Sequence, residues 1–168
     1  MFKIKLLKGQ TLVSFFVPEA LSIFSSAGAA LQALVDWRKR TRGDARAIVM
    51  ELKDNYTYLN MVAFDGVPLE NVIQDLSTAE YKRLAREGYN FNNLKRQKIQ
   101  DDSSFEGTQM ANWVGKSTEE LIASIYKKIS ELKILYPHNK KSDKYRWNVR
   151  VKNIIKLIWL LLKHAQGN

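Results

Sequence analysis

Large apolar residues recur at the spacing of an α-helix throughout the C-terminal segment of the chain. They are Trp147, Val151, Ile154, Ile155, Ile158, Leu161 and Leu162. Their intervals place them on one side of a helix. A helix of about 20 residues is about 30 Å long, and its apolar side must be covered by other elements. The segment therefore predicts a bundle of helices.

A second helix is predicted directly before this segment. Ser117 and Glu120 have the spacing of a capping box, which marks the start of a helix. The apolar residues that follow at helical spacing are Leu121, Ile122, Ile125, Ile129, Leu132 and Tyr136. Pro137 is expected to end the helix, because proline cannot donate a backbone hydrogen bond. Residues 138–144 are polar and basic and predict a turn.

The first half of the chain predicts two longer helices. One begins at Pro18 and ends in the basic run of residues 38–42, with Gly43 suited to a left-handed cap. The other begins at Asp44, an expected N-cap residue, and ends near Asp65.

Shorter elements are expected in the middle of the chain. Residues 68–76 predict a short helix, and Ser77 with Glu80 predicts a capping box for another. Residues 89–116 lack a clean period and are rich in asparagine, aspartate, serine and glycine. They predict a long irregular connection, with a turn of helix around residues 94–99.

These patterns predict an all-α protein with about four to five helices in one bundle. The 168 residues fit one domain spanning residues 1–168. Residues 1–10 alternate weakly between apolar and charged side chains and are expected to form a short strand or a flexible arm.

Residues 11–35 form a mostly apolar stretch whose one charged residue is Glu19. The pattern is shared by signal peptides, membrane-associating segments and buried helices. Pro18 divides the stretch, and Gln32 with four serines makes it more polar. We therefore expect a buried first helix, with membrane association through residues 11–35 as an alternative.

Several kinds of chemistry are excluded or disfavoured. The chain has no cysteine, which removes disulfides and thiolate metal sites and is typical of a reducing, cytoplasmic location. The tetrapeptide 115–118 resembles the end of a phosphate loop, but Met110 stands where that motif needs glycine. His138 and His164 are far apart, and His164 is expected on the surface near a helix end. We expect no enzyme activity, catalytic residue, metal or cofactor, unless a site assembles from distant helices.

The charge is distributed unevenly along the chain. The whole sequence carries +10, and residues 95–168 hold fifteen cations against seven anions, or +8. Residues 44–94 hold five cations against eight anions, or −3. A chain with this pattern is expected to have a polarised surface that attracts an anionic partner, or the acidic part of another copy.

The candidate binding residues are cations with a neighbouring indole. A stripe beside the apolar side of the last helix consists of Lys152, Lys156, Trp159 and Lys163. The further cations are Arg146 and Arg150 in the same helix, Lys140, Lys141 and Lys144 before it, and Lys95, Arg96 and Lys98 in the irregular connection. Lysine and arginine contact phosphates, and an exposed aromatic ring stacks on an unpaired base. Alternatively, the aromatic rings complete the core and the cations are only solvated.

The sequence therefore leaves three functional hypotheses. The first is a non-enzymatic helical module that binds a polyanion, with RNA or DNA expected, through mainly electrostatic contacts. The second is a module for interaction with a protein partner or with another copy of itself. The third is a membrane-associating bundle.

Overall fold

The computed structural model of the protein describes residues 27–166, and all regular elements in this range are helices. The α-helices are α1 (Ala27–Arg40), α2 (Gly43–Phe64), α3 (Leu69–Val72), α4 (Ala79–Arg86), α5 (Thr118–Asn139) and α6 (Trp147–Gln166). The 3₁₀ helices are η2 (Phe91–Asn93), η3 (Ser103–Phe105), η4 (Gln109–Trp113) and η5 (Asp143–Tyr145). The prediction of an all-α fold is confirmed.

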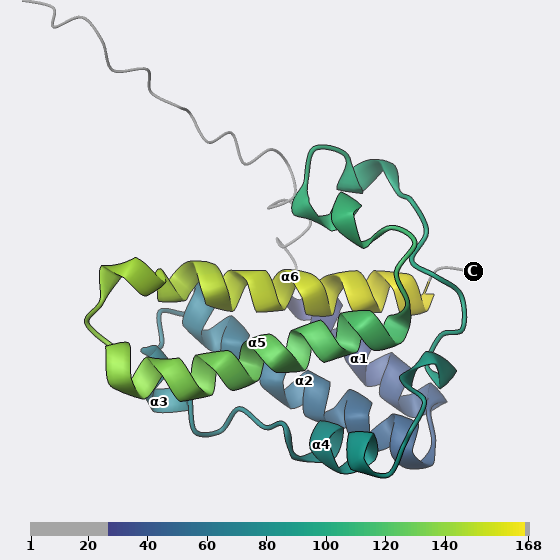
Figure 1. Ribbon diagram of the computed structural model, residues 1–168, viewed down its shortest axis with the longest axis horizontal. Coiled ribbons are helices and arrows are strands. Elements are labelled where there is room, and N and C mark those ends of the chain that lie inside the picture. Colours follow the sequence, from purple (N-terminus) through teal and green to yellow (C-terminus); the bar gives the residue numbers. More distant parts are fainter. Residues whose placement is uncertain (1–26, 167–168) are drawn as a thin grey trace, which may run out of the picture.

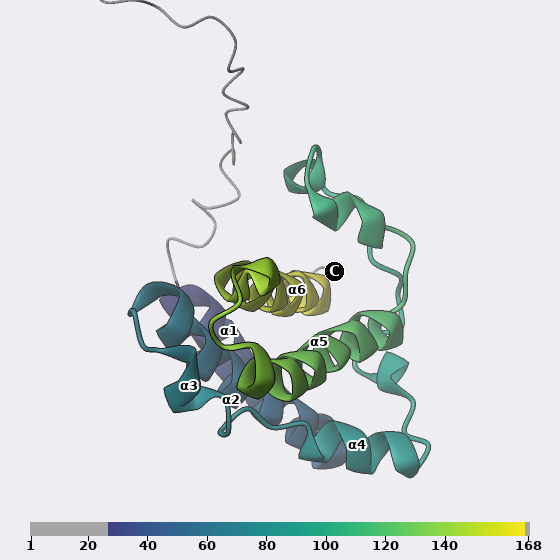
Figure 2. The same ribbon diagram turned by 60° about the vertical axis from the view of Figure 1, so that its left-hand side comes forward.

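Four long helices form the bundle. α6 contacts α1, α2 and α5, and α4 lies along α2 (Figures 1 and 2). α3 and the connection between α5 and α6 lie at one end of the bundle, on the left of Figure 1. The start of α5 lies at the other end. α6 therefore links the two ends of the molecule.

The apolar residues predicted from the period of α6 form the centre of the core. Val151, Ile158 and Leu161 are fully buried, and Trp147 is half-buried. Leu157 and Leu160 lie outside the predicted stripe but are buried as well. The buried surface of α6 is wider than predicted because α1, α2 and α5 all pack against this helix. Each such side chain contributes roughly 1.5–3 kcal/mol of burial free energy.

α5 starts as predicted and ends later than predicted. Ser117 and Glu120 form the capping box: the Glu120 backbone N–H donates to Ser117 Oγ at 3.2 Å, and the Ser117 N–H donates to the Glu120 carboxylate at 2.8 Å. Pro137 does not end the helix, which continues to Asn139. Because Pro137 lies in the last turn, it removes only one backbone hydrogen bond.

The predicted starts of α2 and α4 are wrong in their capping residues. Gly43 has a φ of +53°, as expected, but Asp44 lies in the first turn and Arg42 is the N-cap residue. Ser77 and Glu80 form no capping box, and Thr78 precedes α4 without a side-chain cap.

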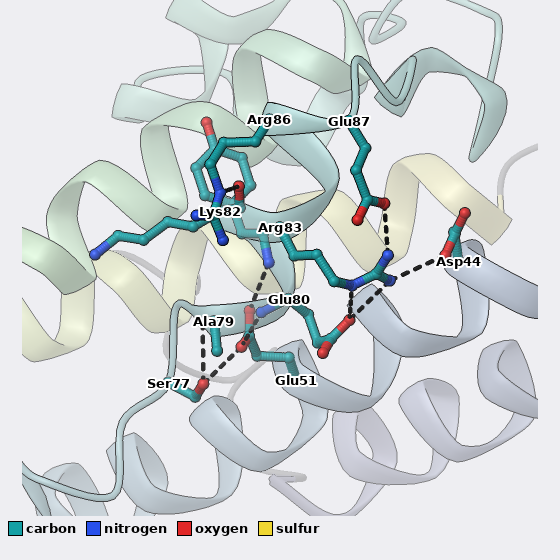
Figure 3. Close-up of polar contacts among 10 residues, drawn as sticks. Asp44, Glu51, Ser77, Ala79, Glu80, Lys82, Arg83, Arg86 and Glu87 are labelled. Carbon is teal, nitrogen blue, oxygen red and sulfur yellow. Dashed lines mark hydrogen bonds and ion pairs between the residues drawn. The ribbon is translucent and has the colours of Figure 1, made fainter.

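Glu51 of α2 caps α4 from a distance (Figure 3). Its buried carboxylate accepts hydrogen bonds from the backbone N–H groups of Glu80 at 2.9 Å and Tyr81 at 3.1 Å. Ser77 Oγ donates to the same carboxylate at 2.6 Å. A carboxylate at a helix N-terminus satisfies unpaired N–H groups and the helix dipole together. This contact joins α4 to the bundle.

Arg83 forms a second polar cluster, between α4 and the start of α2 (Figure 3). Its guanidinium donates to Asp44 at 3.0 Å, Glu80 at 3.0 Å and Glu87 at 2.6 Å. Hydrogen bonds to Asp44 and Glu80 raise the pKa of Arg83 above its usual range. Asp44 thus pairs with Arg83 between α2 and α4, and the Glu80 carboxylate pairs with Arg83 within α4, where the sequence predicted helix caps.

The connection between α4 and α5 leaves the bundle and returns to it. Ile99 N donates to Lys116 O at 2.9 Å, and Gly115 N donates to Ile99 O at 2.9 Å, which closes the base of a loop over residues 100–114. This loop, with η3 and η4, lies above α6 in Figure 1. The predicted turn of helix over residues 94–99 is absent, and the only helical turn near it is η2.

The N-terminal predictions fall mainly outside the described residues. The expected strand or arm over residues 1–10 and the start of the first helix at Pro18 lie there. Within the described part, α1 packs on α2, and Leu34 is fully buried. None of the helices in residues 27–166 combines the length and apolar character needed to cross a membrane.

Candidate nucleic-acid interface

The basic stripe of α6 has three different environments along its length. Lys152 is exposed and Lys156 is half-buried, and neither forms an ion pair with any other residue in the range 27–166. Trp159 is partly buried and packs on the core. Lys163 is held by neighbouring side chains. The charges of Lys152 and Lys156 are therefore the members of the stripe that remain available to a ligand.

Lys163 fastens the loop of residues 100–114 to α6. Its ammonium group lies 2.7 Å from the Asp102 carboxylate and donates to Ser104 Oγ at 2.8 Å. The same group lies over the rings of Phe105, at 5.1 Å, and Trp159, at 5.3 Å. Asp102 accepts hydrogen bonds from Lys163 and from Ser104. These bonds, the one from Lys163 first, lower the pKa of Asp102 to about 2. Lys163 thus has a structural partner that the sequence did not indicate.

Replacing Lys163 by glutamine is expected to loosen this loop. The variant loses the ion pair to Asp102 and the contact with the Phe105 ring, so amide hydrogen exchange in residues 100–106 should become faster. Exchange in α5 should not change. Unchanged exchange in the loop would contradict this role.

A pocket of about 150 Å³ lies between this loop and the C-terminal half of α6. It is lined by Gln97, Ile99, Gln100, Asp101, Asp102, Phe105, Leu160, Lys163 and His164. Gln97 stands between Arg96 and Lys98, so the predicted cations of the connection lie beside the pocket. The fold thereby brings the Lys95–Lys98 group to the same place as the end of the α6 stripe.

His164 is buried, contrary to the prediction that it lies on the surface. Its Nε2 is 2.9 Å from Thr118 Oγ1, and Thr118 Oγ1 donates its hydrogen to Lys95 O at 2.7 Å. Which of these two atoms donates is set by the tautomer of the imidazole. Burial, and then the positive charge of Lys95, lower the pKa of His164, and a hydrogen bond with the Gln97 backbone acts in the opposite direction.

The lowered pKa of His164 predicts a loss of stability on mild acidification. Below the ordinary histidine pKa of about 6.5, His164 binds a proton in the unfolded chain more readily than in the folded protein. Protonation therefore favours unfolding. The urea midpoint should be constant above about pH 7 and should fall as the pH decreases toward 5. His164→Gln keeps a polar side chain beside Thr118 and does not titrate, so this pH dependence should weaken. His138→Gln, at an exposed position, is the control. Equal pH dependence in the wild type and His164→Gln would contradict the prediction.

A second basic group lies at the opposite end of α6. Trp147 stacks on Tyr145 with 4.9 Å between ring centroids and meets the Tyr136 ring edge-on. The guanidinium of Arg150 lies over both Tyr145 and Trp147, at 5.6 and 5.8 Å. The surrounding exposed cations are Lys140, Lys141, Lys144 and Arg146. Together they form a basic end of the bundle with aromatic rings at its centre.

The backbone of this end is fixed by short-range contacts. Arg146 has a φ of 44° at the turn into α6, and the Trp147 indole N–H donates to Asn139 O at 3.2 Å. The Lys140 ammonium lies 3.2 Å from the Glu70 carboxylate of α3, and this ion pair partly neutralises the charge of Lys140. Lys141 and Lys144 make no ion pair among residues 27–166. We call the group Lys140, Lys141, Lys144, Arg146 and Arg150 the basic end.

The predicted binding residues thus fall into two groups joined by α6. Lys163 lines the pocket, and Lys95, Arg96 and Lys98 are close in sequence to the lining residues Gln97 and Ile99. Lys152 and Lys156 lie between the pocket and the basic end. From Lys152 to Lys163 the helix rises about 16 Å. The sequence did not predict the pocket, Asp102 or the burial of His164. The pair Asp101-Asp102 was visible only as a turn signal.

Among the described residues, no group of histidine and carboxylate side chains could hold a metal ion. No protein-family model, curated protein sequence or solved structure matches the chain. The residues of the chain are therefore the basis for a functional proposal.

Proposed function

We propose that this protein is a non-enzymatic module that binds RNA or DNA along α6. The observation that carries the proposal is a row of cations on one side of α6, formed by Lys152, Lys156 and Lys163. This row ends at the pocket, and the basic end lies at the start of the same helix. Phosphates repeat along a nucleic-acid strand, so a row of cations on a straight helix suits them. A cytoplasmic location accompanies this proposal, in line with the absence of cysteine.

Aromatic rings at both ends of the row favour an unpaired strand. The Tyr145–Trp147 stack lies within the basic end, and Phe105 lines the pocket. Base stacking on aromatic side chains contributes roughly 1–3 kcal/mol per base and is independent of sequence. Recognition in this proposal combines electrostatic contacts with stacking.

Lysine footprinting tests the proposed surface in the intact protein. Lysines are acetylated with and without a saturating single-stranded RNA, and the modified positions are quantified. Lys141, Lys144, Lys152 and Lys156 should be protected, because phosphates cover them. Lys82, an exposed lysine of α4, should react equally in both samples. Protection of Lys82 without protection of Lys152 would contradict the proposed surface.

Self-association is a second candidate, and one observation favours it. Arg83 gathers three carboxylates near the start of α2, whereas Lys140 pairs with α3, which follows the end of α2. The 22 residues of α2 separate these places by about 33 Å. An acidic group and a basic end on opposite sides of one molecule suit a head-to-tail contact between copies.

Light scattering over a salt series tests this second candidate. A contact held by charge should weaken as salt rises, so the apparent mass should fall toward that of the monomer. A monomer at every salt concentration would exclude self-association as the function of the polarised surface.

A further inference from the structure

We propose that the pocket between the 100–114 loop and α6 receives one unpaired cytosine base. The proposal rests on the proposed binding of a nucleic-acid strand and adds base preference to it. A base within a strand and a free nucleoside share the chemistry recognised here: a single aromatic ring that presents an amino group to carboxylate and amide oxygens.

The size and walls of the pocket fit a single ring. Its volume is about 150 Å³, and an apolar cavity of about this size holds one benzene molecule. Drug-sized ligands occupy pockets of roughly 300–1,000 Å³. Ile99, Phe105 and Leu160 supply apolar wall, and all three are buried. A six-membered pyrimidine therefore suits the space better than a larger ligand.

The polar groups of the pocket offer acceptors to that ring. Asp101 Oδ1 accepts from the Asp102 N–H at 2.9 Å, and Asp101 Oδ2 has no hydrogen-bond donor among residues 27–166. Gln100 Nε2 donates to Lys98 O at 2.9 Å, which leaves its Oε1 as an acceptor. Carboxylates accept hydrogen bonds from the cytosine N4 amino group. Uracil presents a carbonyl oxygen at the same position, which a carboxylate repels.

The position of the pocket suits a base that belongs to a strand. The connection that forms one wall of the pocket carries Lys95, Arg96 and Lys98. The other wall is formed by α6, in which Lys156 lies two turns before Lys163. These cations attract the phosphates of a strand outside the pocket. Inside it, Lys163 is paired with Asp102, so the carboxylate of Asp101 is the charge that disfavours an anion. A neutral base with its phosphates on the rim satisfies both conditions.

A comparison of oligoribonucleotides that contain only C or only U tests this inference. Strands of equal length differ in the base alone, so their electrostatic binding is closely matched. The full chain should bind the C strand at least about fivefold more tightly, because one good base contact discriminates by about 1–3 kcal/mol. Equal, salt-dependent affinity for both strands would overturn the cytosine pocket and leave the proposed function intact. Absence of binding to both strands would overturn the two proposals together.

A pair of variants assigns the preference to the pocket. Asp101→Asn keeps the acceptor for the Asp102 N–H and adds an amide that serves C and U alike, so the ratio of affinities should fall to about one. Glu106→Gln makes the same change of charge on an exposed residue outside the pocket lining and should retain the preference. A preference that survives Asp101→Asn would overturn the assignment.

Free cytidine distinguishes the two sources of the base. If the pocket serves a strand, cytidine should displace the C strand only at concentrations far above the strand's Kd, because it lacks the phosphate contacts. Cytidine binding as tight as that of the strand would assign the pocket to a free nucleoside instead.

Discussion

Replacing Glu51 by alanine is expected to lower the free energy of unfolding by about 2–4 kcal/mol. The substitution removes the acceptor for the Glu80 and Tyr81 N–H groups and for Ser77 Oγ, so α4 loses its cap and one of its links to α2. Loss of a helix cap costs about 0.5–2 kcal/mol, and each unsatisfied buried donor costs about 1–3 kcal/mol, with partial relief from water. Urea unfolding followed by circular dichroism measures the change.

Two further variants show whether the loss comes from this capping contact. Glu51→Gln retains one oxygen acceptor and should be less destabilising than alanine. Glu131→Ala replaces a half-buried glutamate of α5 that forms no hydrogen bond among residues 27–166 and should change stability by less than about 1 kcal/mol. If Glu51→Ala is no more destabilising than Glu131→Ala, the cap does not hold α4.

Charge reversal at Lys152 and Lys156 together should weaken nucleic-acid binding by about ten- to hundredfold at low salt. These side chains lie in the middle of the cationic row, so their reversal replaces two attractive phosphate contacts by two repulsive ones. Neutral Lys152→Gln/Lys156→Gln should reduce the dependence of log K on log salt by about two contacts. Fluorescence anisotropy with a labelled single strand measures both quantities.

The matched control lies on α4. Lys82→Glu/Arg86→Glu makes the same change of charge with the same spacing of four residues, at exposed positions away from α6. Circular dichroism should show that both double variants remain folded. Equal loss of affinity in the two variants would mean that net charge, and not the α6 surface, controls binding.

The main features of the bundle could be predicted from the sequence because they depend on local pattern. The period of apolar residues identified α5 and α6, and the capping box identified the start of α5. Ser117 and Glu120 are three residues apart, so a single turn of chain brings them together. Gly43 likewise reports a local backbone requirement, a positive φ.

The contacts that the sequence did not reveal join residues far apart in the chain. Ser77 and Glu80 have the spacing of a capping box. The Glu80 backbone N–H instead donates its hydrogen bond to Glu51, which lies 29 residues earlier in the chain. The burial of His164 depends on Thr118, 46 residues away. The environment of Lys163 depends on Ser104, 59 residues away. Helical period identifies the side of α6 on which a residue lies but not which loop covers it.

The candidate site likewise has a part that could be predicted from local sequence and a part that depends on contacts between distant residues. Local composition identified the cations of α6 and of the Lys95–Lys98 group. Only the fold brings the Lys95–Lys98 group near Lys163 and places Asp101 and Gln100 in the lining of the pocket. The proposed preference for cytosine therefore rests on the tertiary structure, whereas the proposed binding of a polyanion rests mainly on the sequence.

The central claim is that the cationic row of α6 binds the phosphates of a nucleic-acid strand. Its most direct test is the affinity of the full chain for a labelled single-stranded RNA and for a DNA duplex over a series of salt concentrations. We expect log K to fall linearly with log salt, with a slope of about −0.7 per contact for the single strand and −0.9 for the duplex. A slope equivalent to three or more contacts is the predicted result. No binding at low salt, or an affinity that does not change with salt, would contradict the claim.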